Sequence, residues 1–387
     1  MADRPQAAPV PEAPAVPAAV RPAGAAGSVT VREYGTRYLR ISVRYHGDAR
    51  FSWLRVPGPA HDRPQTAPSP AAGAALRRVD AAVADAGSGT GSGAGAGAGS
   101  GAGAGAGSGA GRGARLALGE RAAASESGER GGVVYRVPGA LSVARLLPSG
   151  DDTAYRLSVR ALADLGRTLR QLHDVPWEFA EPVPPHHGVG RLLAWISGTA
   201  PDGDGARLRA LAHDRLGARL WTRLTDWAVA AQEPPGRGGA VLLHGAPSTG
   251  WLVPSPAGDH SVLLTGEEVT GGDPALDLGW VLGELHELRS AAARGLGAAG
   301  QGPPVDYPAA ARALLAGYLR EAGYLRKEDA AAAVEALPAG TARAATLRLA
   351  VHMRDFASFV GWHEDLRRYA DLLAETLDAD GAPTLRW

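Results

Sequence analysis

The chain has 387 residues, with 40 basic and 40 acidic side chains and no cysteine. This length suits one large domain or two lobes, and the balanced charge gives no electrostatic reason to expect a nucleic-acid or anionic-membrane partner. The lack of cysteine excludes disulfides, thiolate metal sites and a cysteine nucleophile. No apolar run reaches about 18 residues, and residues 1–28 lack a basic-then-apolar signal pattern, so we expect a cytoplasmic protein without a membrane span.

Two stretches have the composition of low-complexity chain. Residues 1–28 contain six prolines and ten alanines and almost no large apolar side chain, so we predict a disordered tail. Residues 87–113 alternate glycine with small residues, and 14 of these 27 residues are glycine. A silk-like strand would need stacking partners that a single segment lacks, so a flexible insertion is predicted here.

The segment between the tail and residue 147 has the pattern of a β-rich lobe. Period-two alternation and flanking turns predict six strands and one helix. The strands are expected at Val29–Glu33, Tyr38–Tyr45, Arg50–Val56, Ala114–Leu118, Val133–Val137 and Leu141–Leu147, and the helix at Ala71–Ala86. The triplet His46-Gly-Asp48 is predicted to form a hairpin turn, and residues 148–150 (Pro-Ser-Gly) a hinge.

From residue 151 onward the apolar spacing is mostly helical. We expect a helix that ends at His173 and further helices at Arg207–Ala231, Pro274–Leu288, Pro308–Glu321, Lys327–Leu337, Ala342–Val360 and Asp365–Leu377. Two short strands, Ala240–Leu243 and Ser261–Leu264, are predicted to flank a loop. The sequence thus predicts an α+β, bilobal, protein-kinase-like fold, with a β-rich N-lobe at 29–147 that holds the 87–113 insertion and a helical C-lobe at 148–387.

Three ordered segments resemble those of one known family. They are Leu165-Gly-Arg-Thr-Leu-Arg-Gln-Leu-His173, Val241-Leu-Leu-His-Gly-Ala-Pro-Ser-Thr-Gly-Trp251 and Gly272-Asp-Pro-Ala-Leu-Asp-Leu278. The first resembles the helix before the catalytic hairpin of the aminoglycoside phosphotransferase/choline kinase-like family. The second is similar to its catalytic loop, His-Gly-Asp-x-x-x-x-Asn, and the third to the segment after its metal-binding Asp. The resemblance covers roughly residues 29–380 and implies a kinase-like fold with ATP and Mg²⁺ as possible cofactors.

Five positions depart from what the resemblance implies. The strand lysine that contacts nucleotide phosphates is matched by Arg55, and the helix Glu that orients it by Ala72. The catalytic Asp is matched by Ala246, which cannot accept a proton. The metal-binding Asn and Asp are matched by Trp251 and Thr265, which supply no negative charge. This pattern favours a kinase fold that has lost or altered its standard chemistry.

Other side chains near these positions could substitute for the missing groups. Glu267 and Glu268 could reach a metal, although a Glu at the first of these positions is common in the family. His244 is the nearest titratable base, and Ser248 could contact a phosphate or simply suit a turn. The histidine pair at 186–187 lacks metal-ligand spacing, so we predict that it lies at the surface. Matches with mainly structural roles in the family are Gly245, Gly250, Asp273 and Asp277, together with His244.

The loop suggests a particular branch of the family. His244-Gly-Ala-Pro-Ser-Thr-Gly250 is similar to the kinase-like components of class V lanthipeptide and thioamitide pathways. That resemblance implies a precursor peptide and lyase-like biosynthetic enzymes as partners, with a role in modifying Ser or Thr of the peptide. A pseudokinase scaffold that binds a peptide or a partner enzyme is the alternative, which the large ring of Trp251 favours. A small-molecule kinase of the aminoglycoside type is a third hypothesis, and it most needs the missing Asp.

Overall fold

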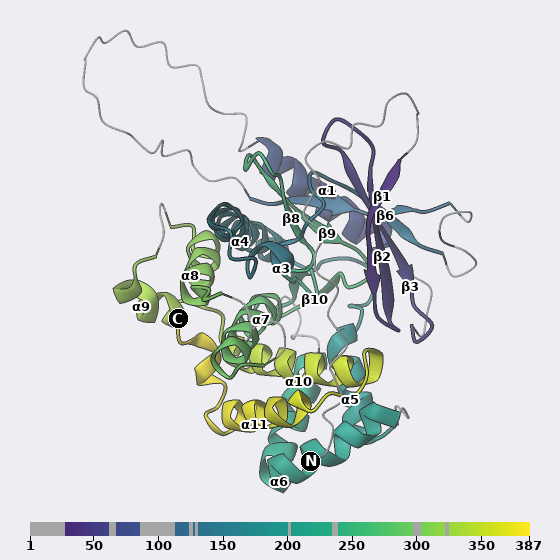
Figure 1. The fold of residues 1–387 in the computed structure, drawn as a ribbon. Helices are drawn as coiled ribbons and strands as arrows, with labels where there is room; N and C mark the ends of the chain where they lie inside the picture. The colour runs from purple at the N-terminus through teal and green to yellow at the C-terminus, as the bar shows by residue number, and fades with distance from the viewer. Residues whose placement is uncertain are drawn as a thin grey trace.

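The computed structural model describes residues 28–61, 67–85, 113–123, 127, 131–199, 203–233, 239–296, 303–321 and 325–387. The predicted tail and nearly all of the predicted glycine-rich insertion therefore lie outside the described residues. Within the described parts, a β-rich N-terminal sheet precedes a mostly helical C-terminal part (Figure 1). This arrangement confirms the predicted α+β class, with a β-rich N-terminal part and a mostly helical C-terminal part, while the lobe boundaries remain predictions.

The N-terminal sheet has five antiparallel strands in the order β1-β2-β3-β6-β5. They are β1 (Val29–Gly35), β2 (Leu39–Tyr45), β3 (Phe51–Pro57), β5 (Glu120–Arg121) and β6 (Val133–Val137). Strand β3 is central and almost entirely buried, so its side chains on either face meet protein rather than water. The His46 triplet forms the predicted turn, in which the His46 N–H donates to the Arg50 carbonyl at 2.9 Å.

Strand β4 (Arg115–Leu118) does not join this sheet, although it was predicted within the N-lobe. It pairs in parallel with β9 (Ser261–Thr265), which is antiparallel to β8 (Leu252–Pro254). Helix α1 (Pro70–Asp85) lies before β4 in the sequence, and its Asp80 binds both Arg115 and the backbone N–H of Leu116. A segment before the predicted hinge is thus built into a sheet of the C-terminal part.

The predicted strand Leu141–Leu147 was wrong, because this segment contains the short helix α3 (Val143–Leu146). Ser142 precedes it with an extended backbone, and the Leu147 N–H donates to the Val143 carbonyl. Val143 and Leu147, four residues apart, are both fully buried. A short apolar run fits either a buried strand or one helical turn, and the packing of these two side chains decides for the helix.

The C-terminal part contains the predicted helices and one that was not predicted. They are α4 (Asp152–His173), α5 (His187–Ser197), α6 (Gly203–Gln232), α7 (Ala275–Ala293), α8 (Tyr307–Tyr318), α9 (Ala330–Glu335), α10 (Thr341–Phe359) and α11 (Asp365–Asp378), with short 3₁₀ turns at Lys327–Asp329 and Ala382–Leu385. A two-stranded ladder joins β7 (Val241–Leu243) to β10 (Thr270–Gly272). Among the described helices, none is both long and apolar enough for a bilayer span.

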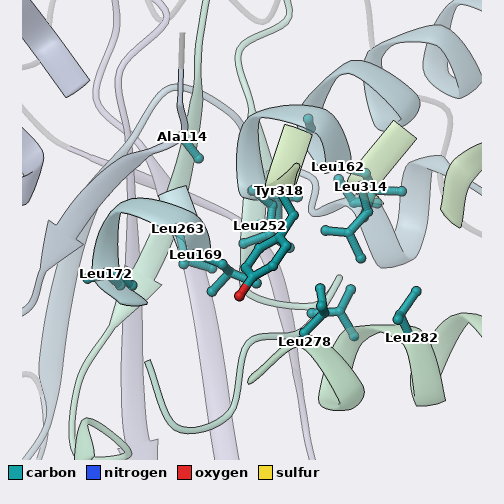
Figure 2. Packing of buried hydrophobic residues seen from close by; sticks show 14 of the residues in the cluster. Ala114, Leu162, Leu169, Leu172, Leu252, Leu263, Leu278, Leu282, Leu314 and Tyr318 are labelled. Atoms are coloured by element: carbon teal, nitrogen blue, oxygen red, sulfur yellow. The ribbon is translucent and has the colours of Figure 1, made fainter. Parts of the chain in front are cut away.

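The main core lies where α4 meets α8. Leu162 and Leu169 of α4 pack with Leu314 and Tyr318 of α8, and β8, β9 and α7 add further leucines (Figure 2). The two helices approach closely at small residues. A Cβ on Gly317 would lie 2.0 Å from the Ala163 carbonyl oxygen, so this contact admits only glycine. The close approach fixes α4, whose last residue, His173, contributes to the candidate site.

Candidate functional site

Helix α7 anchors the start of the loop that follows β7. The Asp277 carboxylate accepts the backbone N–H of His244 at 2.7 Å and that of Gly245 at 2.8 Å. His173 adds a ring nitrogen 3.3 Å from the same carboxylate. Burial alone would raise the pKa of Asp277, but these hydrogen bonds and the neighbouring His173 outweigh it and hold the pKa below its usual value. Asp277 is therefore a buried anion that organises backbone.

The ring of His244 is also used to shape the loop. Its Nε2–H donates to the Leu264 carbonyl at 2.9 Å, and its Nδ1 accepts the Ala246 N–H at 3.4 Å. Burial lowers the pKa of His244, so the ring is neutral at pH 7. Gly245 has φ +89°, and a Cβ there would lie 1.7 Å from the Glu268 carbonyl oxygen. With both ring nitrogens engaged, His244 holds β9 beside the loop, and its predicted part in catalysis remains a prediction.

Glu284 of α7 holds the middle of the loop, and sequence reasoning missed it. Its carboxylate accepts the Thr249 N–H at 2.9 Å, the Thr249 hydroxyl at 2.6 Å and the Ser248 hydroxyl at 3.2 Å. The Ser248 Oγ in turn accepts the Gly250 N–H at 3.0 Å. The predicted site residue Ser248 thus has turn-forming contacts. The only sequence signal for Glu284 was its place seven residues, two helical turns, after Asp277.

Arg55 faces the loop from the centre of β3. Its guanidinium carbon lies 4.1 Å from the centre of the Trp251 ring, and its Nη1 donates to the Tyr135 hydroxyl at 3.3 Å. Only 6% of Arg55 is exposed. A guanidinium over an aromatic face is stabilised by the ring quadrupole, by about 2 kcal/mol when desolvated. The side chains at the positions of the family's lysine and metal-binding Asn therefore pack directly against each other.

No carboxylate from α1 reaches Arg55. Ala72, at the position of the orienting Glu, is buried at 2% exposure and contributes only a methyl group to the core. Asp80 on the same helix forms a two-point ion pair with Arg115, with both N–O distances at 2.7 Å. Within the described residues, Arg55 has no carboxylate oxygen within 4.0 Å. Among the described residues, the ion pair that orients a kinase lysine has no counterpart at Arg55.

The residues present do not fit a Mg²⁺ ion. The Thr265 hydroxyl donates to the Leu263 carbonyl at 3.3 Å, and Trp251 offers an indole face. Glu267 lies 3.3 Å from the His61 ring, and Glu268 lies 3.2 Å from the His187 ring. Over the described part of the chain, no group of three His, Asp or Glu side chains could hold a metal. We therefore assign no chemical step to a metal, and ligation by Glu267 or Glu268 remains a prediction.

A second contact joins the N-terminal sheet to the helices beyond the loop. Tyr38, the residue before β2, stacks on Phe359 at the end of α10, with ring centres 4.6 Å apart, and on His61 at 4.3 Å. Arg191 of α5 donates to the Tyr38 hydroxyl at 3.2 Å and to Asp355 of α10 at 2.9 Å. The β1–β2 turn is thereby fixed to helices α5 and α10.

A cavity of about 270 Å³ lies elsewhere in the described part of the chain. Trp227 of α6, Leu276 of α7 and Arg343 of α10 line it, and no residue of the loop 244–251 does. Asp273 lies at its wall and caps the start of α7 by accepting the Ala275 N–H at 2.8 Å. His186 also lines it, and at 4% exposure this residue is buried, so the predicted surface position was wrong for His186.

Comparisons with known proteins found solved structures of low sequence identity and no family. No family model and no curated protein matches the chain. Solved structures with a similar arrangement include a choline/ethanolamine kinase family protein from Mesorhizobium loti, with 14% identity, TM-score 0.42 and coverage of 93% of this chain and 91% of that one. Spectinomycin phosphotransferase in complex with ADP and spectinomycin has 10% identity, TM-score 0.46 and coverages of 91% and 92%. Plasmodium vivax ethanolamine kinase has 8% identity, TM-score 0.46 and coverages of 91% and 81%.

Proposed function

We propose that the protein is a kinase-fold binding component that does not transfer phosphate from Mg·ATP. The observation that carries this proposal is the stack of the Arg55 guanidinium on the Trp251 ring at 4.1 Å. A ring held on a buried cation occupies the position where the resembled family has a metal-binding amide. The fixed positive charge beside it also opposes the approach of a divalent cation.

The side chain that would accept the proton of the substrate hydroxyl is missing as well. Phosphoryl transfer to a hydroxyl is helped by a side chain that accepts the hydroxyl proton. Ala246 has only a methyl group there, and the neighbouring His244 already uses both ring nitrogens within the fold. The small-molecule kinase hypothesis needs that proton acceptor most, so the geometry favours a binding role over it.

The contacts across the interlobe region support a fixed binding surface. Tyr38 is held between Phe359, His61 and Arg191, and Arg55 is held by Trp251. A kinase that turns over must open and close its lobes to exchange nucleotide. Two contacts between the lobes instead favour one conformation that a partner can recognise.

The partner that we propose is the precursor peptide of a lanthipeptide- or thioamitide-type pathway, together with its lyase-like enzymes. This finer proposal depends on the loop sequence at 244–250 alone. It is tested by co-purification of the tagged full chain with the peptide encoded nearest to it and with any neighbouring lyase. Capture of the peptide by the wild type is the expected result, and failure to bind peptide or lyase would reject this partner class.

A phosphotransfer assay tests the proposed function directly. Wild type is incubated with radiolabelled ATP and Mg²⁺, alone and with the peptide. A variant that carries Ala246→Asp, Trp251→Asn and Thr265→Asp is assayed beside it, because these changes restore the three side chains of the resembled family's motif. We expect label transfer and ATP hydrolysis by the wild type to equal the protein-free rate. Mg²⁺-dependent transfer by the wild type that is lost in Arg55→Met, but kept in the exposed-arginine control Arg40→Met, would contradict the proposal.

A further inference from the structure

The cavity between α6, α7 and α10 has an apolar interior. Leu276, Ala344 and Leu347 line it, and all three are buried. The partly buried ring of Trp227 forms another part of its wall. An apolar cavity of about 150 Å³ can hold a benzene molecule. The volume of about 270 Å³ is therefore sufficient for an aromatic ring or a branched aliphatic chain with several further atoms attached.

One wall of the cavity is held by hydrogen bonds within the fold. The Gln232 side chain at the end of α6 accepts the His186 N–H at 3.2 Å and donates to the His186 carbonyl at 2.7 Å. The Thr270 hydroxyl of β10 donates to the Pro184 carbonyl. These contacts tie the cavity-lining segment 183–186 to α6 and β10. The cavity is thus preformed on this side, as small-molecule sites usually are.

Charged side chains of both signs line the cavity where it meets the surface. Arg343, Asp273 and Glu233 all line it and are exposed. The Arg343 guanidinium carbon lies 5.5 Å from the centre of the Trp227 ring, and among the described residues no ion pair joins it to either carboxylate. A guanidinium stacked on a ring keeps the N–H groups at its edge for an acceptor. Asp273 uses one carboxylate oxygen for the Ala275 N–H, so its charge is available to a ligand.

We propose that this cavity binds a free α-amino acid with a large apolar side chain. The apolar interior accepts the side chain, Arg343 binds the α-carboxylate through its fork of N–H groups, and Asp273 and Glu233 attract the α-ammonium group. A simple acid would meet two carboxylates and a simple amine would meet Arg343, whereas a zwitterion matches charges of both signs. The proposal goes beyond the proposed function and does not depend on it, because no residue of the loop 244–251 lines the cavity.

Calorimetric titration of the full chain with L-phenylalanine and L-leucine tests the proposal. We expect saturable binding of phenylalanine or leucine with a Kd of about 1 mM or lower. L-alanine should bind at least about tenfold more weakly, because its methyl group fills little of the apolar interior. N-acetyl-phenylalanine lacks the ammonium group and phenylalanine amide lacks the carboxylate, so each should bind about threefold or more weakly than phenylalanine.

Variants locate the bound molecule. Ala230→Phe places a ring at the exposed edge of the cavity and should abolish binding, whereas Ala210→Phe, at an exposed position of α6 outside the cavity lining, should have no effect. Arg343→Met should remove the preference for phenylalanine over its amide. Glu233→Gln combined with Asp273→Asn should remove the preference over N-acetyl-phenylalanine. These three positions are exposed, so the variants keep the fold and test the charges even if Ala230→Phe destabilises the protein.

The contrary results are equally specific. No binding of phenylalanine or leucine at about 10 mM would overturn the proposal. Binding that survives Ala230→Phe, in a variant whose melting curve is intact, would place the ligand elsewhere and overturn it too. If the amide or the acetylated compound binds as tightly as phenylalanine, the cavity recognises the end of a peptide rather than a free amino acid, and the proposal is again wrong. The proposed function stands apart from these results, because the transfer assay judges it.

Discussion

The Asp277 carboxylate lies 2.7 Å from the backbone nitrogen of His244, so α7 and the end of β7 share one buried anchor. The anchor fixes where the loop begins and where α7 begins relative to the sheet. It is made of one carboxylate and two backbone N–H groups. The start of the loop can therefore keep its shape whichever side chains stand at positions 246 and 251.

Replacing Asp277 by Asn should destabilise the protein by about 2–4 kcal/mol. The amide retains one acceptor oxygen for two backbone donors and removes the charge that faces His173. Urea unfolding at pH 7 measures the change, with Asp273→Asn, an exposed cap, as a control expected to cost less than about 1 kcal/mol. The pKa of Asp277 is lowered in the fold, so its contribution is present above the ordinary carboxyl pKa and lost as pH falls below it. The difference between Asp277→Asn and wild type should therefore shrink in acid.

Glu284→Gln should loosen the middle of the loop at a cost of about 1–3 kcal/mol. The carboxylate has two acceptor oxygens, whereas the amide of Gln has one. The amide cannot accept the Thr249 N–H, the Thr249 hydroxyl and the Ser248 hydroxyl together, so at least one of these donors loses its partner. Hydrogen exchange of the amides of residues 248–250 should rise in this variant. Ser248→Ala removes one donor to Glu284 and the acceptor of the Gly250 N–H, but it leaves both bonds from Thr249 to Glu284. A rise in exchange of the Thr249 amide as large in Ser248→Ala as in Glu284→Gln would therefore refute the assigned role of Glu284.

Acid should destabilise the protein through His186. Burial lowers the pKa of His186 to about 4, against the opposing charges of Glu268 and Asp277. Because the folded pKa lies below the unfolded value of 6.5, the neutral ring stabilises the fold above pH 6.5. That stabilisation, about 3 kcal/mol at most, is lost as pH falls toward 4.

His186→Asn isolates this effect. The asparagine oxygen can accept the Val189 N–H that the His186 ring accepts, so the start of α5 stays capped. The free energy of unfolding of the variant should depend less on pH between 6.5 and 4 than that of wild type. Urea unfolding of both proteins across that pH range measures the difference. Parallel curves for the two proteins would show that His186 does not contribute.

Gly317→Ala should destabilise the α4–α8 contact by more than about 2 kcal/mol. The added methyl would lie 2.0 Å from the Ala163 carbonyl oxygen, which belongs to a packed helix and cannot move away freely. Gly73→Ala on α1 is the matched control, because its methyl would meet nothing closer than 3.7 Å. That change should stabilise the helix by up to about 1 kcal/mol. Equal effects of the two substitutions would contradict the close approach.

The sequence predicted most elements of the fold but few contacts of the site. Long helices such as α10 and alternating strands such as β2 have strong periodic patterns, so their positions follow from local sequence. The turn of apolar residues at 143–146 is too short for its period to distinguish a helix from a strand. The partners of Asp277 and Glu284 come from segments more than 30 residues away, and only packing brings them together. The stack of Arg55 on Trp251 could not be predicted either, because each residue suits a surface as well as a core.

The parallel pairing of β4 with β9 joins residues separated by about 150 positions along the chain. A polypeptide cut within residues 148–150 would leave Arg115–Leu118 on one fragment and Ser261–Thr265 on the other. Each fragment would then expose an unpaired edge able to pair with other chains. The same pairing closes a long loop, so its formation should come late in folding and set the pace of assembly.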